Sequence, residues 1–303
     1  MVEEGLYFFE LYTDKVVKGL KADKLYYQGK TKYQFVQIFY NQFYGKVLYL
    51  DKKIQSAQID EFVYHESLIH PALFTHPHPR QVLIIGGGEG ATLREALRHE
   101  VIQRAVMVDI DEELVKLCQK FLPEWSEGAF SNPKTELVFE DACCYLDEVE
   151  NRFDVIISDL TEPVQGGPSV HLFTKEFFDK IFKALKKDGL FVLQAGSTDP
   201  FYHEFYSSCV KTLESVFPLV RPYWSFIFSF GLPWGFVLAS KQYDPLQITE
   251  EEIAQRIKER KTNNLKFYHP PLQKGMFALP LYLTGGIKKG KVLTDKKPFI
   301  WKL

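Results

Sequence analysis

Residues 82–90 read VLIIGGGEG: the apolar run Val82-Leu83-Ile84-Ile85 leads directly into Gly86-Gly87-Gly88-Glu89-Gly90. Four consecutive apolar residues are typical of a strand that is buried on both faces of a parallel sheet. A helix is expected from Thr92 to His99, so the glycines form the turn between a strand and a helix. Such a turn lets the backbone pass close to a ligand, with the N–H groups of the helix behind it. A tight turn that binds no ligand is the alternative.

Beyond this turn, strand and helix patterns alternate along the chain. Strands are expected at residues 105–108, 136–139, 154–158 and 190–194, and helices at 112–121, 174–185, 201–217 and 250–261. Asp188-Gly189 is a helix-ending signal and is expected to close the helix at 174–185. This alternation predicts an α/β fold with a parallel, doubly wound, Rossmann-like sheet and right-handed crossovers.

The N-terminal part of the chain has a different pattern. Lys32 to Phe43 alternates between polar and apolar residues, which is typical of a strand with one buried face. A helix is expected to begin near Asp60 and to end at Pro71. The sequence therefore predicts a small N-terminal β-strand domain over residues 1–70 and a Rossmann-like catalytic domain over residues 71–303.

Composition and charge exclude several classes of protein. Of the 303 residues, 46% are hydrophobic and 25% are charged, which excludes a disordered, collagen-like or coiled-coil chain. The formal net charge is −2, so no surplus of basic residues indicates a nucleic-acid or anionic-membrane partner. Residues 1–10 lack the basic start of a signal peptide, and four cysteines make no disulfide framework in a chain of this length. A cytoplasmic location is therefore expected.

One uncharged stretch, from Pro222 to Ser240, is long enough to span a membrane. It contains two prolines and two glycines, however, and residues 223–230 roughly alternate between polar and apolar. Two strands joined by a Gly-Pro turn are therefore expected in place of a membrane-spanning helix.

Acidic residues follow several of the expected strands, at the sheet edge where an open α/β sheet binds its ligand. Asp109 ends the second of these strands, 23 residues after Gly86. This is the spacing of an acid that binds ribose hydroxyls, with a cap on the next helix as the alternative role. The glycine turn and Asp109 together indicate a site for a nucleoside or a dinucleotide.

Glu89 narrows the choice of ligand. A carboxylate in the glycine turn would repel the pyrophosphate of NAD and the carboxylate of S-adenosylmethionine, and it would attract an ammonium group. Decarboxylated S-adenosylmethionine, which carries a sulfonium and a primary ammonium, meets this requirement. Alternatively, Glu89 is an exposed acid that the helix dipole favours at the start of a helix.

Two further carboxylates, Asp159 and Glu162, lie in Ser158-Asp159-Leu160-Thr161-Glu162-Pro163, after the fourth expected strand. The following loop contains Gly166, Gly167 and Pro168 and suits a mobile lid. Paired acids at a strand end could bind a metal, act as acid and base, hold a polyamine or only cap a turn. Because no His or Cys with ligand spacing is clustered beside them, no metal is expected.

Together these motifs resemble the polyamine aminopropyltransferases, the family of the spermidine and thermospermine synthases. The resemblance covers nearly the whole chain and is carried by Gln55-Ser56, Asp60 to Glu66, Gly86 to Gly90 with Arg94-Glu95, Val108 to Asp111, Glu140 to Ala142, Ser158 to Pro163, Leu172 to Thr174 and Phe277 to Pro280. It implies the Rossmann-like fold of S-adenosylmethionine methyltransferases with a small N-terminal β-domain. It also implies a homodimer or homotetramer that is built through the N-terminal strands.

On the donor side, the resemblance implies a nucleoside site that includes Gly86 and Gly88 of the glycine turn. The other residues of this site would be Gln34 and Asp109 at the sugar or its thio substituent, Asp141 and Ala142 at the adenine, and Pro168 of the lid beside the thioadenosine. Glu89 stands at the family's usual Asp and would hold the aminopropyl ammonium of the donor or the amine of the acceptor.

The resemblance also implies a groove, shared by donor and acceptor, that Gln55, Tyr64 and His65 line, with a purely structural role as the alternative for His65. Glu162 would bind the acceptor amine, and Asp159 matches the family's proton acceptor. Asp159 can take a proton from the amine while the amine attacks the propyl carbon next to sulfur. The sulfonium then leaves as neutral methylthioadenosine, so decarboxylated S-adenosylmethionine is a co-substrate and neither a metal nor a cofactor is needed. Most of the rate is expected from in-line positioning and from acids that favour cations.

The chain departs from the family pattern on the acceptor side. The usual Thr-Asp-Pro is Thr161-Glu162-Pro163, and a tyrosine that commonly lines the putrescine pocket is replaced in Ser229-Phe230-Gly231. The expected acceptor is spermidine, giving thermospermine, or putrescine or agmatine, giving spermidine or aminopropylagmatine, with a slight preference for spermidine. An S-adenosylmethionine-dependent methyltransferase is the alternative function.

Overall fold

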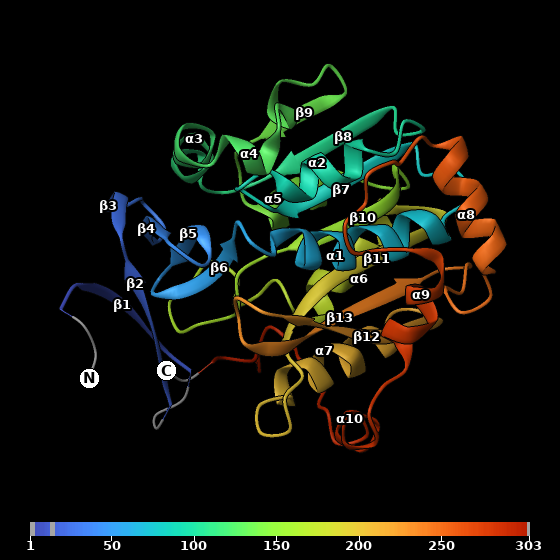
Figure 1. Ribbon diagram of the computed structural model, residues 1–303. Coiled ribbons are helices and arrows are strands. Elements are labelled where there is room, and N and C mark those ends of the chain that lie inside the picture. Colours follow the sequence, from blue (N-terminus) through green and yellow to red (C-terminus); the bar gives the residue numbers. More distant parts are fainter. Residues whose placement is uncertain (1–3, 13–15, 302–303) are drawn as a thin grey trace.

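The computed structural model describes residues 4–12 and 16–301. In its N-terminal part, β1 (Leu6–Leu11) and β2 (Val17–Ala22) form an antiparallel hairpin. A four-stranded antiparallel sheet follows in chain order, formed by β3 (Lys24–Lys30), β4 (Phe35–Asn41), β5 (Gly45–Leu50) and β6 (Lys53–Ala57). These strands lie at one side of the larger part of the molecule (Figure 1). The short β segments predicted for this part of the chain are confirmed.

The larger sheet has seven strands in the order β12-β13-β11-β10-β7-β8-β9. Their bounds are β7 (Gln81–Gly86), β8 (Arg104–Val108), β9 (Thr135–Val138), β10 (Phe153–Asp159), β11 (Leu185–Ser197), β12 (Leu219–Ile227) and β13 (Leu232–Ser240). The strands from β7 to β11 are parallel, and β13 is antiparallel to both of its neighbours. The winding reverses between β7 and β10, which is where an open α/β sheet binds its ligand.

Helices cover both faces of this sheet (Figure 1). One face packs against α1 (Glu61–Thr75), α2 (Ala91–Leu97), α8 (Glu250–Glu259) and α9 (Pro270–Phe277). The other packs against α5 (Ala142–Asp147), α6 (Lys175–Ala184), α7 (Glu204–Glu214) and α10 (Leu281–Ile287). Helices α3 (Glu112–Phe121) and α4 (Pro123–Ser126) pack against the four-stranded N-terminal sheet. The sequence patterns did not predict the short helices α4, α5, α9 and α10.

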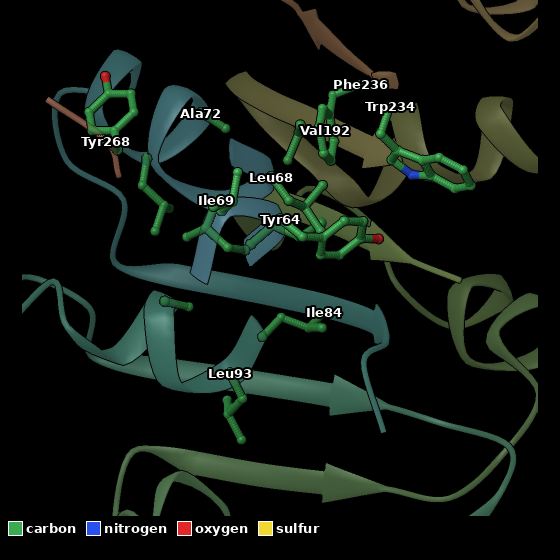
Figure 2. Close-up of a cluster of buried hydrophobic side chains, with 14 of the residues drawn as sticks. Tyr64, Leu68, Ile69, Ala72, Ile84, Leu93, Val192, Trp234, Phe236 and Tyr268 are labelled. Atoms are coloured by element: carbon green, nitrogen blue, oxygen red, sulfur yellow. The ribbon is translucent and has the colours of Figure 1, made fainter. Parts of the chain in front are cut away.

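The run at residues 82–85 is buried on both faces of the sheet, as predicted. Val82 and Ile84 belong to the core on the side of α1 and α2, whereas Leu83 and Ile85 belong to the core on the other side. Figure 2 shows the first of these cores, with Tyr268 at one end of the cluster and Tyr64 and Trp234 toward the other. Because successive strand residues point to opposite faces, a continuous apolar run is needed to fill both cores.

The prediction that the first helix ends at Pro71 is wrong, because α1 continues through Pro71 to Thr75. A proline inside a helix has no N–H group for the carbonyl four residues earlier, which here belongs to Ser67. The hydroxyl of Tyr223, from β12, donates a 2.9 Å hydrogen bond to Ser67 O. A tertiary contact therefore satisfies the carbonyl that the proline leaves free.

The predicted helix-ending signal Asp188-Gly189 lies inside β11, so this prediction is also wrong. Helix α6 ends at Ala184, and β11 begins at the next residue. The pairing of β11 with β10 is irregular here: Phe153 pairs with Leu185, but Val155 pairs with Leu190. The polar signal therefore marks a bulge at the start of a strand and not the end of a helix.

The uncharged stretch from Pro222 to Ser240 forms the antiparallel pair β12–β13, as predicted. The turn between the strands contains Gly231, whose φ of +64° favours glycine. Within the described residues, no helix is long and apolar enough to cross a membrane.

Candidate active site

A pocket of about 1030 Å³, partly open to solvent, lies beyond the carboxyl ends of β7, β8 and β10. Every residue predicted for the site lines this pocket except His65. These lining residues are Gln34, Gln55, Tyr64, Gly86, Gly88, Glu89, Asp109, Asp141, Ala142, Asp159, Glu162 and Pro168. They come from the N-terminal sheet, from α1 and from the loops after four strands, so only the tertiary fold brings them together.

The glycine turn brings two acidic strand ends together. Gly86 has a φ of +79°, and a side chain there would collide with the backbone carbonyl of Asp159. The N–H group of Gly87 donates a 3.0 Å hydrogen bond to that same carbonyl. A Cβ atom on Gly88 would lie 2.9 Å from Asp109 Oδ2. The glycines are therefore required for close packing of the turn against Asp159 and Asp109.

Two hydroxyl groups hold the carboxylate of Asp159. Tyr64 Oη, from α1, donates to Oδ1 over 2.7 Å, and Thr92 Oγ1, from α2, donates to Oδ2 over 2.5 Å. Burial and the charge of Asp159 raise the pKa of Tyr64 well above its usual value, so its hydroxyl stays a donor. Asp159 is therefore a fixed carboxylate that can still accept a proton from a ligand in the pocket.

Buried polar side chains contact both carboxylate oxygens of Glu89. Ser56 Oγ donates to Glu89 Oε2 over 2.6 Å, and His65 Nε2 lies 2.7 Å from Glu89 Oε1. The other ring nitrogen of His65 lies 2.9 Å from Glu61 Oε2, and Arg94 pairs with the same Glu61 oxygen at 2.8 Å. Glu89 is thus the end of a buried charged network that links α1 to α2.

His65 lies behind Glu89 and does not line the groove. Its side chain is 1% exposed. Burial alone would lower the pKa of the ring, but the hydrogen bonds and charges of Glu61 and Glu89 outweigh this effect and raise it to about 10. His65 is therefore an imidazolium that fixes the position of a pocket carboxylate.

At the carboxyl end of β8, Asp111 and not Asp109 caps the next helix: Asp111 Oδ1 accepts from the N–H group of Leu114 in α3. Asp111 Oδ2 also accepts from Gln34 Nε2 over 2.9 Å, which ties the N-terminal sheet to the strand end. Asp109 accepts from the N–H group of Asp111 and faces the pocket. Burial, with the charges of Asp111 and Asp159, raises the pKa of Asp109 to about 7.

Farther along, Asp141 caps α5 by accepting a 2.7 Å hydrogen bond from the N–H group of Cys143. Ala142 is the first residue of that helix, and Pro168 lies across the pocket on the loop after β10. Among the residues that the structure describes, no Lys, Arg or His side chain lines the pocket, whereas six acidic residues do: Glu89, Asp109, Glu140, Asp141, Asp159 and Glu162. The described residues therefore form a strongly acidic pocket that suits a cation.

The comparisons with known proteins point to one family. Residues 6–58 match the spermidine synthase tetramerisation domain, and residues 61–252 match the spermine/spermidine synthase domain. The chain belongs to the spermine/spermidine synthase family. It is therefore an aminopropyltransferase, which transfers an aminopropyl group to a polyamine acceptor.

Individual relatives of this family are similar over most of the chain. A polyamine aminopropyltransferase of Hyperthermus butylicus is 43% identical over 92% of this chain and 91% of the relative. The thermospermine synthase ACAULIS5 of Arabidopsis thaliana is 41% identical over 88% of this chain and 78% of the relative. A spermidine synthase solved with the transition-state analogue AdoDATO has a TM-score of 0.88 and 34% identity, covering 95% of this chain and 96% of the other. The predicted fold is thereby confirmed.

Three residues in or next to this pocket of the aminopropyltransferase were not predicted from the sequence. Gln194 donates to Leu160 O over 2.5 Å, and its Oε1 accepts from Trp234 Nε1 over 3.1 Å; both side chains line the pocket. The third is Thr92, the second donor to Asp159. Gln194 lies near the end of a parallel strand and could have been found by the strand-end rule. Trp234 comes from the antiparallel strand β13, to which that rule does not apply.

Among the described residues no group of three or more His, Cys, Asp or Glu is placed to hold a metal ion.

Proposed function

We propose that Asp159 is the proton acceptor in aminopropyl transfer from decarboxylated S-adenosylmethionine, which releases methylthioadenosine. The observation that carries this proposal is the carboxylate of Asp159, which Tyr64 and Thr92 hold in a pocket that no basic side chain of the described residues lines. The acceptor amine loses its proton to Asp159 as its lone pair attacks the propyl carbon, and the C–S bond electrons leave with sulfur. Base assistance contributes about 10²–10⁴-fold in rate.

Acidic side chains on both sides of Asp159 position the donor in the pocket. Glu89 pairs with the aminopropyl ammonium, because it is the pocket carboxylate that His65 and Ser56 hold next to the glycine turn. Asp109 accepts from the ribose hydroxyls. The remaining donor contacts are assigned to Gly86 and Gly88 of the turn, Gln34 beside the sugar, Asp141 and Ala142 at the adenine, and Pro168 over the thioadenosine.

The acceptor lies on the opposite side of Asp159. Glu162 follows Asp159 by three residues and pairs with the next ammonium of the acceptor, while Gln55 and Tyr64 line its path. Acids on both sides align the amine with the carbon–sulfur bond, so positioning and electrostatic stabilisation supply most of the rate. The acceptor is spermidine or a smaller amine such as putrescine or agmatine.

Product analysis identifies the acceptor. The enzyme is incubated with decarboxylated S-adenosylmethionine and, separately, putrescine, cadaverine, agmatine and spermidine, and the products are separated by chromatography. A tetraamine from spermidine alone makes the enzyme a thermospermine synthase, and spermidine or aminopropylagmatine makes it a synthase for small acceptors. Methyl transfer from S-adenosylmethionine, with no methylthioadenosine from any acceptor, would overturn the proposed function.

Replacing Asp159 tests its role. Asp159→Asn keeps the shape of the side chain but removes the base, so we expect kcat to fall by about 100-fold or more. Binding of methylthioadenosine, measured by calorimetry, should change little. Asp179→Asn, in the exposed pair with Lys175, is the matched control. Activity of Asp159→Asn within about threefold of the unmodified enzyme would contradict the assignment.

We also propose a homodimer or homotetramer, since residues 6–58 match a tetramerisation domain. A cytoplasmic enzyme without a nucleic-acid or membrane partner remains the simplest proposal from the composition. The division into an N-terminal unit (1–70) and a catalytic unit (71–303), and the absence of a metal or cofactor, likewise stay predictions.

A further inference from the structure

A second, smaller pocket, whose volume of about 370 Å³ includes space open to solvent, adjoins the proposed acceptor side of the active site. It is lined by Glu10, Tyr12, Lys53, Glu162, Gly196, Ser197, Leu232, Trp234 and Trp301. Glu162 and Trp234 line both pockets. The two pockets therefore meet at these two side chains.

Aromatic side chains form much of the wall of the second pocket. Trp301 comes from the C-terminal segment, which lies outside the two stretches that match the family models. The backbone N–H group of Trp301 donates a 2.7 Å hydrogen bond to Pro163 O, which connects this segment to the loop that carries Glu162. In Figure 1 the same segment, drawn in red, runs toward β1 and β2, and Tyr12 directly follows β1. Aromatic faces next to carboxylates are favourable surroundings for an alkylammonium group.

The charges of the second pocket come from Glu10, Glu162 and Lys53. Lys53 Nζ lies 3.6 Å from Glu10 Oε1 and donates a 3.1 Å hydrogen bond to Leu11 O, and both charged side chains are 11% exposed. Lys18, on β2, also interacts with the charge of Glu10. Because Lys53 already pairs with Glu10, Glu162 is the carboxylate of this pocket without an ion-pair partner among the described residues.

We propose that Lys53 is a specificity-determining residue that limits the cationic charge an acceptor can place in the second pocket. One ammonium group of the acceptor, beyond the reacting amine, pairs with Glu162. A second ammonium group would have to approach Glu10, and the positive charge of Lys53 would repel it. A triamine carries two ammonium groups beyond the reacting amine, and a diamine carries one. Lys53 therefore lowers the efficiency of triamines relative to diamines. This inference rests on the proposed function, since it requires the acceptor to pass Glu162.

Charge-removing variants test the proposal through the ratio of kcat/KM for spermidine to kcat/KM for putrescine. Lys53→Met keeps the aliphatic stem and removes the charge, so the ratio should rise about tenfold, mainly through a lower KM for spermidine. Lys52→Met, at the neighbouring exposed lysine, is the matched control and should leave the ratio unchanged. An unchanged ratio in Lys53→Met would overturn the proposal.

A second variant should change the same ratio of kcat/KM values in the opposite direction. It also tests the proposal if Lys53→Met does not fold. Glu10→Gln leaves the ammonium of Lys53 uncompensated, so the same ratio should fall by about tenfold. A constant or higher ratio in Glu10→Gln would also overturn the role of Lys53. Absence of methylthioadenosine from the unmodified enzyme with every acceptor would instead refute the proposed function, so the two failures are distinguishable.

Discussion

At the scale of single residues, two carboxylates of the pocket, Asp159 and Glu89, are held by neutral or cationic side chains from other elements. Asp159 is held by two hydroxyls, and Glu89 by the hydroxyl of Ser56 and the imidazolium of His65. Buried carboxylates are costly unless they are paired or hydrogen-bonded. These partners therefore keep the acids in place before a cationic substrate arrives, which is what electrostatic preorganisation requires.

The raised pKa of His65 predicts a specific dependence of stability on pH. The pKa is about 10 in the folded protein and about 6.5 in an unfolded chain, so the stabilisation is complete below pH 6.5 and is lost as the pH rises toward 10. Relative to His65→Gln, the unmodified protein should lose about 3 kcal/mol of its stability advantage between pH 7 and pH 10. Denaturant unfolding of both proteins at pH 7, 8.5 and 10 measures this difference.

A matched control is His171→Gln, because His171 is exposed and pairs only loosely with Asp295 at 3.7 Å. The free energy of unfolding of this variant should depend on pH in the same way as that of the unmodified protein. If the stability curves of His65→Gln and the unmodified protein stay parallel from pH 7 to pH 10, His65 is not an imidazolium in the folded state.

At the scale of elements, the continuation of α1 past Pro71 depends on Tyr223. Tyr223→Phe should cost about 1–3 kcal/mol of unfolding free energy, because it leaves the buried Ser67 carbonyl without a partner. In a Pro71→Ala background the restored N–H group of residue 71 can bond to Ser67 O, so the same change should cost distinctly less. Denaturant unfolding of the four proteins gives this coupling energy, and additive costs would contradict the account.

At the scale of the whole molecule, the β1–β2 hairpin presents an apolar face that stays exposed among the residues that the structure describes. The exposed residues of this face include Phe9, Leu11 and Val17, while Phe8 and Glu10 point to the opposite, buried side. An apolar face of this kind is typical of an interface between chains. It lies within the stretch that matches the tetramerisation domain.

We therefore expect Phe9→Glu to lower the oligomeric state, because it places a charge in an apolar contact. Light scattering coupled to size-exclusion chromatography measures the mass. Leu281→Glu, at an 88% exposed residue of α10 outside that stretch, should leave the mass unchanged. An unaltered mass for Phe9→Glu would place the interface elsewhere.

The sequence by itself determined the type of fold and the acids at the strand ends. The run Val82 to Ile85 could be interpreted because burial on both faces demands an unbroken apolar segment. Asp109 and Asp159 could be found because parallel strands all end at the same edge of the sheet. Both inferences depend only on residues close together in the chain. The resemblance to a known family added the proposed roles of Gln34, Gln55 and Pro168, which no local pattern indicates.

Only the tertiary structure decided how these residues are supported. His65 was expected to line the groove, but α1 turns it toward Glu61 and Glu89. The passage of α1 through Pro71 depends on Tyr223, more than 150 residues away in the chain. The second pocket joins Glu10, Lys53, Glu162 and Trp301. Such contacts join residues far apart in sequence, and no local pattern of hydrophobicity or spacing records which of them will meet.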